Sequence, residues 1–271
     1  MKYSICNELF KDWKLEDVFD YLSKLGYHGI EIAPFTLAED VRYLDKRYRR
    51  TLSEMSSIYG VEIVGLHWLL VSPKGLHINH PDESIRRKTL EYMKALIDFN
   101  HDIGGRVLVF GSPKQRNILE GVSKERAWKF TVEFFKETSR YAEDRSSIIA
   151  FEPLARHLTN FINTVTEALK LVKDVNEEAF RIILDVYSMT DEGRPYSEII
   201  KEANGFLVHF HANDTNKLGP GFGEADYKDI REGLLAIGYN GFLSVEVFDT
   251  SPGIEKIATE SIRFLRKIFE G

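Results

Sequence analysis

The sequence predicts an α/β protein folded as a single domain, a closed (β/α)8 barrel that spans residues 1–271. The main observation is that eight short apolar runs alternate strictly with segments of helical periodicity. No Ser-, Gly- or Pro-rich linker divides the chain, and its 43% hydrophobic residues are enough to fill one core. Parallel strands need a crossover helix between them, and closing the sheet into a barrel removes both of its edges.

The expected strands are eight runs rich in β-branched and aromatic residues, which favour an extended backbone. They cover residues 3–6, 29–33, 61–69, 106–110, 148–151, 181–186, 206–211 and 242–247. The main alternative is an open doubly wound sheet, which usually has a glycine-rich turn after its first strand. The first run is followed instead by Asn7-Glu8-Leu9-Phe10, so the closed barrel is favoured.

The expected helices follow the strands in order and cover residues 15–25, 38–59, 82–102, 124–144, 164–175, 196–203, 226–237 and 254–269. The first of them has an apolar face and is followed by Gly26, which suits the left-handed conformation at a helix C-terminus. Thr164 and Glu167 have the spacing of a capping box at the start of the fifth helix.

Composition and charge exclude several classes of function. The formal net charge of −6 and the lack of a long basic run argue against a partner made of nucleic acid, so a small molecule is the expected partner. Cys6 is the only cysteine, which excludes an internal disulfide and a thiolate zinc cluster. The amino terminus is too short and polar for a signal peptide, and no stretch approaches 18 apolar residues. We therefore expect a cytoplasmic protein without a membrane segment.

Four polar residues end apolar runs on consecutive strands, where (β/α)8 barrels place their catalytic groups. They are Glu152, Asp185, His211 and Glu246. Because neighbouring strands lie about 4.8 Å apart, side chains from strands five to eight can converge at the barrel mouth. Three such carboxylates would repel one another unless a cation neutralised them. Three oxygen ligands and one nitrogen suit one divalent ion, Mn²⁺ first, with Mg²⁺, Co²⁺ or Zn²⁺ as alternatives.

These residues lie in motifs that resemble those of a known family. The motifs, in chain order, are Phe151-Glu152-Pro153, Leu184-Asp185-Val186, His209-Phe210-His211-Ala212-Asn213-Asp214 and Val245-Glu246-Val247. The set resembles the xylose-isomerase-like TIM barrel superfamily, and within it the sugar epimerases of the D-tagatose 3-epimerase type. Residues 211–217 and 220–227 are similar to that family's strand-seven signature and the loop after it. The resemblance covers the chain from end to end.

The resemblance implies a divalent metal ion held by Glu152, Asp185, His211 and Glu246, with the two glutamates facing opposite sides of a bound sugar. It also implies epimerisation or isomerisation of a ketose or keto sugar. Removing a proton beside a carbonyl requires that the negative charge of the enediolate be stabilised, which a metal bridging two substrate oxygens would do. Glu152 and Glu246 are then the candidate catalytic residues, one for each face of the sugar.

Three positions depart from the ketose 3-epimerases that the chain resembles. Those enzymes carry a glutamate, a histidine and an arginine where this sequence has Leu158, Ser188 and Lys217. Two contacts to the hydroxyl groups of a free ketose are thereby lost. Arg156 and Lys217 could instead bind a carboxylate, so the preferred substrate is a keto sugar acid of the ketogluconate or tagaturonate kind. The alternative for both residues is an ordinary surface ion pair.

Other residues near the strand ends are candidates with a more ordinary alternative. His67 is expected to bind a substrate hydroxyl and Trp68 to stack on the sugar ring, unless both are core residues. Glu31 ends the second strand and is expected to orient a lysine or arginine of the pocket, or to cap the next segment. His209 shares a strand face with His211 but lies one step deeper, which favours a role behind the ligands.

Three other functions stay open as alternatives. A lyase similar to the inosose dehydratases would begin from the same enediolate and then lose a β-hydroxyl group. An endonuclease of the apurinic type shares the barrel, but it binds three zinc ions through additional histidines, and here Asp185 is followed by Val186-Tyr187. A sugar-binding module without activity would not exchange substrate protons with solvent. The sugar, the inverted carbon, the physiological metal and the number of subunits are left open by the sequence.

Overall fold

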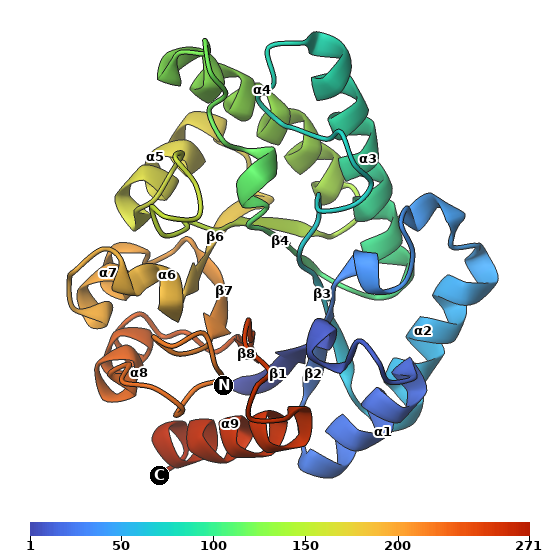
Figure 1. The fold of residues 1–271 in the computed structure, drawn as a ribbon, viewed down its shortest axis with the longest axis vertical. Coiled ribbons are helices and arrows are strands. Elements are labelled where there is room, and N and C mark those ends of the chain that lie inside the picture. Colours follow the sequence, from blue (N-terminus) through green and yellow to red (C-terminus); the bar gives the residue numbers. More distant parts are fainter.

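A closed barrel of eight parallel strands forms the centre of the molecule, and helices surround it (Figure 1). The computed structural model describes all residues from 1 to 271. Each strand pairs with the next in sequence, and β1 pairs with β8 to close the sheet. The predicted fold class is therefore confirmed. The strands are β1 (Lys2–Cys6), β2 (Gly29–Ile32), β3 (Glu62–Leu66), β4 (Val107–Phe110), β5 (Ile148–Phe151), β6 (Phe180–Asp185), β7 (Leu207–Ala212) and β8 (Phe242–Val245).

The helices cover the outer face of the barrel and agree with the predicted ones to within one residue at most ends. They are α1 (Leu15–Leu25), α2 (Lys46–Tyr59), α3 (Glu83–Asp102), α4 (Lys124–Glu143), α5 (Val165–Val175), α6 (Val186–Thr190), α7 (Tyr196–Glu202), α8 (Tyr227–Ala236) and α9 (Ile254–Phe269). Among them, none combines the length and the apolar character that crossing a bilayer requires.

The helix predicted over residues 38–59 is shorter than expected, because α2 begins only at Lys46. Two aspartates divide this segment. The carboxylate of Asp40 accepts a hydrogen bond from the backbone N–H of Arg42 and caps a separate 3-10 turn, η3 (Val41–Tyr43). Asp45 then caps α2 by accepting from the backbone N–H of Tyr48 at 2.8 Å. The prediction was wrong here because each aspartate satisfies the first N–H groups of its own helix.

The short helix α6 was not expected from the sequence. It starts directly after β6, where the carboxylate of Asp185 accepts from the backbone N–H of Ser188 at 2.7 Å. The predicted capping box at Thr164 is present in altered form. Thr164 accepts from the N–H of Glu167 at 3.2 Å, but the Glu167 carboxylate accepts from the N–H of Asn163 instead of closing back on Thr164.

The interior of the barrel is apolar beside β5 and β6 and polar beside β7 and β8. Because side chains alternate along a strand, the residues two positions before the site residues also face inward. On β5 and β6 these are the apolar residues Ala150 and Ile183, which pack with Val107 and Val109 of β4. On β7 and β8 they are His209 and Ser244, which are both buried. Buried polar side chains of this kind require partners inside the protein.

The pairing between β3 and β4 is the shortest in the barrel and forms a seam. Only Gly65 with Val107 and Leu66 with Leu108 are in register there, whereas four pairs join β4 to β5. At the seam the two backbones approach closely, since a Cβ atom on Gly65 would lie 1.8 Å from the carbonyl oxygen of Val107. The lack of a side chain at Gly65 is therefore what permits this contact.

Candidate active site

The strand ends bring together the four residues that the sequence predicts as metal ligands. Glu152 directly follows β5, Asp185 ends β6, His211 is the next-to-last residue of β7 and Glu246 directly follows β8. One potential ligand atom from each lies within 4.8 Å of those of the others. All four are buried, with at most 5% of their surface exposed. The spacing and burial match a site for a single small ion.

The charges of this group fit a bound cation. Burial, followed by the negative charge of Glu246, raises the pKa of Glu152 to about 8. The same two causes raise the pKa of Asp185 to about 6. The protein alone therefore disfavours the ionised forms of Glu152 and Asp185. A divalent cation bound between them would offset both the burial and the repulsion from Glu246. Oxygen and imidazole donors without sulfur suit a borderline-hard ion such as Mn²⁺.

Glu246 is held between two histidines. Its Oε2 lies 3.0 Å from Nδ1 of His211, and its Oε1 lies 3.5 Å from Nδ1 of His67. Burial alone would raise the pKa of Glu246, but His211 and then His67 lower it to about 2. The other ring nitrogen of His67 lies 2.9 Å from Oε2 of Glu8. The two glutamates of the site therefore have opposite environments, which is a frequent property of acid and base pairs.

Glu31 stands behind His211 and was assigned the wrong partners from the sequence. Its Oε2 lies 3.3 Å from Nε2 of His211, and its Oε1 lies 2.6 Å from Nε2 of His209. It neither orients a lysine or arginine nor caps a segment. By holding Nε2, Glu31 turns Nδ1 of His211 toward the other three residues. His209 is deeper in the barrel than His211 and pairs with Glu31, in agreement with the prediction.

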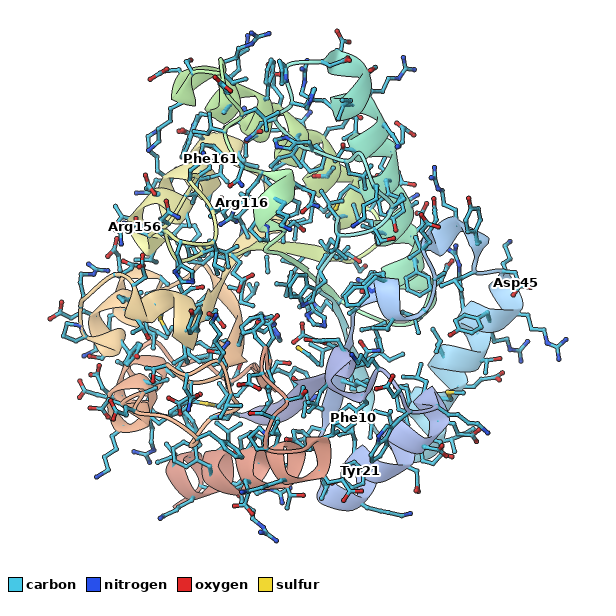
Figure 2. The ribbon with its side chains drawn as sticks, viewed as in Figure 1. Phe10, Tyr21, Asp45, Arg116, Arg156 and Phe161 are labelled. Atoms are coloured by element: carbon cyan, nitrogen blue, oxygen red, sulfur yellow. The ribbon has the colours of Figure 1, made fainter.

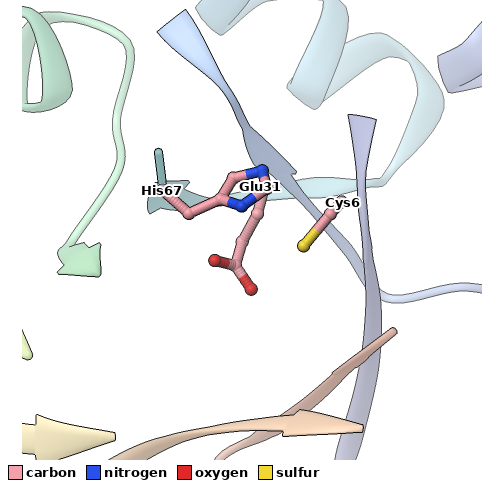
Figure 3. Close-up of side chains that lie close together, drawn as sticks. All are labelled: Cys6, Glu31 and His67. Carbon is pink, nitrogen blue, oxygen red and sulfur yellow. The ribbon is translucent and has the colours of Figure 1, made fainter. Parts of the chain in front are cut away.

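Cys6, Glu31 and His67 converge inside the barrel from the first three strands (Figure 3). Burial, followed by the charges of Glu31 and Glu8, raises the pKa of the Cys6 thiol well above its usual range. The thiol therefore stays protonated and is a poor metal ligand. Glu31 contacts His211 and His67 contacts Glu246, so these side chains adjoin the group of four.

Asn213, which belongs to the strand-seven motif, orients Asp185. Its side-chain N–H donates to Oδ2 of Asp185, and its side-chain oxygen accepts from the backbone N–H of Tyr187 at 2.8 Å. Because the backbone N–H of Ser188 donates to the other carboxylate oxygen, both oxygens of Asp185 are fixed. The sequence contained this residue in a motif but gave no indication of its partner.

Arg116 is fully buried beside the site and escaped the sequence analysis (Figure 2). Its guanidinium donates to the backbone carbonyls of Glu152, at 2.6 Å, and of Ile162, at 3.2 Å. It also lies over the ring of Phe151, 4.7 Å from the centroid. No carboxylate pairs with it directly. Arg116 thus fixes the backbone at Glu152 and carries a positive charge close to the group of four.

Of the three residues predicted to bind substrate, two line the cavity beside the group of four and one does not. His67 and Lys217 line a cavity of about 190 Å³ whose walls also include Glu152, Asp185 and Glu246. Arg156 does not line it. Its side chain is 57% exposed and forms an ion pair of 2.8 Å with Asp191, toward the periphery in Figure 2. Arg156 therefore occupies the surface ion pair that the sequence analysis named as its alternative.

The positions that depart from the ketose 3-epimerases also face this cavity. Leu158 and Ser188 both line it, together with Trp68. The hydroxyl oxygen of Ser188 and the indole nitrogen of Trp68 are buried without a hydrogen-bond partner. Both polar atoms are therefore available to a bound molecule.

Comparison with known proteins places this chain in a family. The family model described as xylose isomerase-like TIM barrel matches residues 19–268. The chain belongs to this family. A relative within it, a D-psicose 3-epimerase of Ruminiclostridium cellulolyticum, is 28% identical over 87% of this chain and 81% of its own length.

A second relative, a 3-dehydro-D-guloside 4-epimerase of Escherichia coli, is 21% identical over 91% of this chain and 92% of its own length. The solved structure of the D-psicose 3-epimerase of Clostridium cellulolyticum with D-tagatose has a TM-score of 0.87 to this chain, covers 99% of both chains and is 22% identical. At this identity the structural likeness shows the shared fold.

Proposed function

We propose that this protein is a divalent-metal-dependent epimerase that inverts a carbon beside the carbonyl of a ketose or keto sugar. The observation that carries the proposal is the pair of glutamates, Glu152 and Glu246, within one buried group that also contains Asp185 and His211. The two relatives named above support the same reaction class, since each acts as an epimerase on a different sugar.

In this proposal Glu152, Asp185, His211 and Glu246 would hold the metal ion. When bound, the ion would stabilise the negative charge that develops on the substrate oxygens as a proton leaves the neighbouring carbon. His211 and His67 keep Glu246 in its carboxylate form, which is the only form of this group that can accept a proton. Glu152 lies on a different strand end and returns a proton to the opposite face. One proton transfer on each face inverts the carbon.

Within this class we propose a preference for a keto sugar acid over the uncharged ketose. Lys217 lines the cavity and places a cation near the mouth, 5.8 Å above the ring of Tyr187. Because Arg156 is held by Asp191, this preference depends on Lys217 alone. An exposed ion pair contributes about 0–1 kcal/mol, so the preference is expected to be below about tenfold. Neither the dehydratase nor the endonuclease alternative gains support from a residue of the site.

The proposal is tested by incubating the Mn²⁺-loaded protein with ketoses and keto sugar acids in D₂O and following the products by NMR. Epimerisation through proton removal predicts one deuterium at the inverted carbon and a product that differs only in configuration there. Loss of water would identify a lyase instead. A protein that binds these sugars without incorporating deuterium would contradict the proposed reaction.

A further inference from the structure

Four aromatic side chains form a continuous row along the mouth of the cavity, which we term the aromatic arc: Phe35, Trp68, Phe248 and Tyr187. The ring of Trp68 lies 6.3 Å from that of Phe35 and 6.4 Å from that of Phe248, and Phe248 lies 6.2 Å from Tyr187, centroid to centroid. Trp68, Phe248 and Tyr187 line the same cavity as Glu152 and Glu246. The arc therefore adjoins the reaction site directly.

The arc is built from four separate segments. Phe35 lies in the 3-10 turn η2 (Pro34–Thr36) after β2, Trp68 follows β3, Tyr187 lies in α6 after β6, and Phe248 follows β8. Phe35 is 42% exposed and Phe248 is 43% exposed. Leu158, which is 36% exposed, adds a further apolar side chain to the cavity lining. Contiguous apolar surface around a pocket mouth is a frequent mark of ligand binding.

Trp68 is held in an unfavourable backbone conformation at this position. Its φ angle of 54° lies in the left-handed region, which costs free energy for any residue with a Cβ. Its indole N–H is buried and has no partner in the protein. Trp68 therefore combines a strained backbone with an indole N–H that has no partner, and it lines the cavity. Backbone strain of this kind occurs preferentially at ligand sites.

The floor and the mouth of the cavity differ in chemistry. The floor carries Glu152, Asp185 and Glu246, which suit the polar, reacting part of a sugar. The mouth offers Trp68, Leu158 and Phe248, which give few partners to the hydroxyl groups at the far end of a free hexose. A ring that presents an apolar or C–H face would pack against these side chains instead.

We propose that the aromatic arc is a binding subsite for a second ring joined to the reacting sugar by a glycosidic bond, so that the substrate is a keto-glycoside. This inference rests on the proposed function, because it assumes that the keto sugar occupies the floor. A carboxylate on the sugar does not compete with it, since the carboxylate and the glycosidic bond occupy different carbons. The indole N–H of Trp68 is then available to an oxygen of the sugar or of the linkage.

The test measures binding without turnover. The Mn²⁺-loaded protein is titrated calorimetrically with methyl β-D-glucopyranoside and with phenyl β-D-glucopyranoside, neither of which has a carbonyl that can enolise. We expect the phenyl glucoside to bind about three- to tenfold more tightly, the size of effect that one good aromatic contact gives. Phe248→Ala and Trp68→Leu should each reduce the ratio of the two affinities toward one. Tyr43 is 79% exposed and lines no part of the cavity, so the control variant Tyr43→Leu should leave the ratio of the two affinities unchanged.

Phe248 is 43% exposed and belongs to no buried core cluster, so its replacement leaves the fold intact and keeps the test decisive if the Trp68 variant is unstable. Equal affinities of the wild-type protein for both glucosides, or a ratio that survives in Phe248→Ala, would overturn the inference. The outcome is independent of the proposed reaction. Ring-dependent binding without deuterium exchange would reject the epimerase and keep the subsite, whereas exchange without ring-dependent binding would do the reverse.

Discussion

Glu152 and Glu246 are the residues whose removal is most informative. We expect Glu152→Gln and Glu246→Gln each to lower the rate of epimerisation by more than about 10²-fold, because an amide keeps the shape of the side chain but cannot accept the proton. The rate is measured by NMR and the fold by circular dichroism. Glu54→Gln, on the exposed face of α2, serves as the control. Near wild-type turnover in both site variants would contradict a mechanism with one base on each face.

Leu158 and Ser188 are the residues expected to set the preference between sugars. Both line the cavity at positions where the ketose 3-epimerases that the chain resembles carry a glutamate and a histidine. Leu158→Glu combined with Ser188→His should therefore raise kcat/KM for D-fructose or D-psicose relative to a keto acid by about tenfold, the value of one charge-assisted hydrogen bond. Leu158→Met is the control of similar size. An unchanged ratio of kcat/KM values would show that these positions do not select the sugar.

Residue patterns could predict the four site residues but only part of their surroundings. Glu152, Asp185, His211 and Glu246 stand out because each is a polar residue at the end of an apolar strand. Glu31 and Arg116 could not be placed, because their partners are determined by the closed barrel. Glu31 contacts His209, 178 positions away, and Arg116 contacts the backbone of Glu152 from another loop. Arg156 was misplaced because a pattern of charges does not distinguish a pocket from the nearby Asp191.

For helices and strands, the predictions were accurate where a segment contained a single clear pattern of apolar residues. Runs of apolar residues indicated all eight strands, and α9 has the predicted limits. The segment 38–59 contains two competing capping residues, Asp40 and Asp45, and only the three-dimensional structure shows that both are used. The helix α6 was missed because its cap, Asp185, was assigned to the end of the strand and to the metal site alone.

The segment between β3 and α3 is expected to make stability depend on pH through His77. Burial, followed by the nearby His80, lowers the pKa of His77 to about 4, while an unfolded histidine titrates near 6.5. The folded protein therefore favours the neutral ring. Its contribution to the free energy of unfolding is complete above about pH 6.5 and is lost as the pH falls toward 4.

We expect the free energy of unfolding of the wild-type protein to fall by about 1–2 kcal/mol more than that of His77→Gln between pH 7.5 and pH 5. Urea denaturation at both pH values measures the difference. His101→Gln, at the exposed end of α3, should follow the wild-type protein. Parallel behaviour of His77→Gln and the wild type would contradict a neutral buried ring.

At the scale of the molecule, the fold could be predicted because eight repeats of one strand and one helix leave few ways to cover every apolar face. The two register shifts of the barrel, beside Glu31 and beside Ile183, could not be predicted. Irregularities of this type re-aim neighbouring side chains. The position of Glu31 behind His211 depends on the closure of the barrel.

The whole molecule is expected to be stabilised by the metal ion. Folding buries Glu152, Asp185 and Glu246 together, and an ion that binds only the folded protein shifts the equilibrium by about 2.7 kcal/mol at 100 times its Kd. For a domain of this length we expect Tm to rise by about 5–10 °C between EDTA and saturating Mn²⁺. Differential scanning calorimetry measures the shift. His211→Ala should lose most of it, and a Tm that ignores Mn²⁺ would argue against the site.

The seam between β3 and β4 bears on how freely this enzyme can change its specificity. Above the two registered pairs, the loop after β3 is joined to the loop after β4, since Leu70 donates to Ser112 at 3.3 Å and Asn79 donates to the carbonyl of Arg116 at 2.7 Å. The short pairing between β3 and β4 is thus reinforced by two loops. One of them carries Trp68, and the other carries Arg116, which fixes the backbone at Glu152. Most loops of such a barrel are exchangeable modules on an independent scaffold. At the seam, the loops after β3 and β4 also hold the barrel together. We therefore expect sequence changes that alter substrate specificity to occur in the other loops around the mouth.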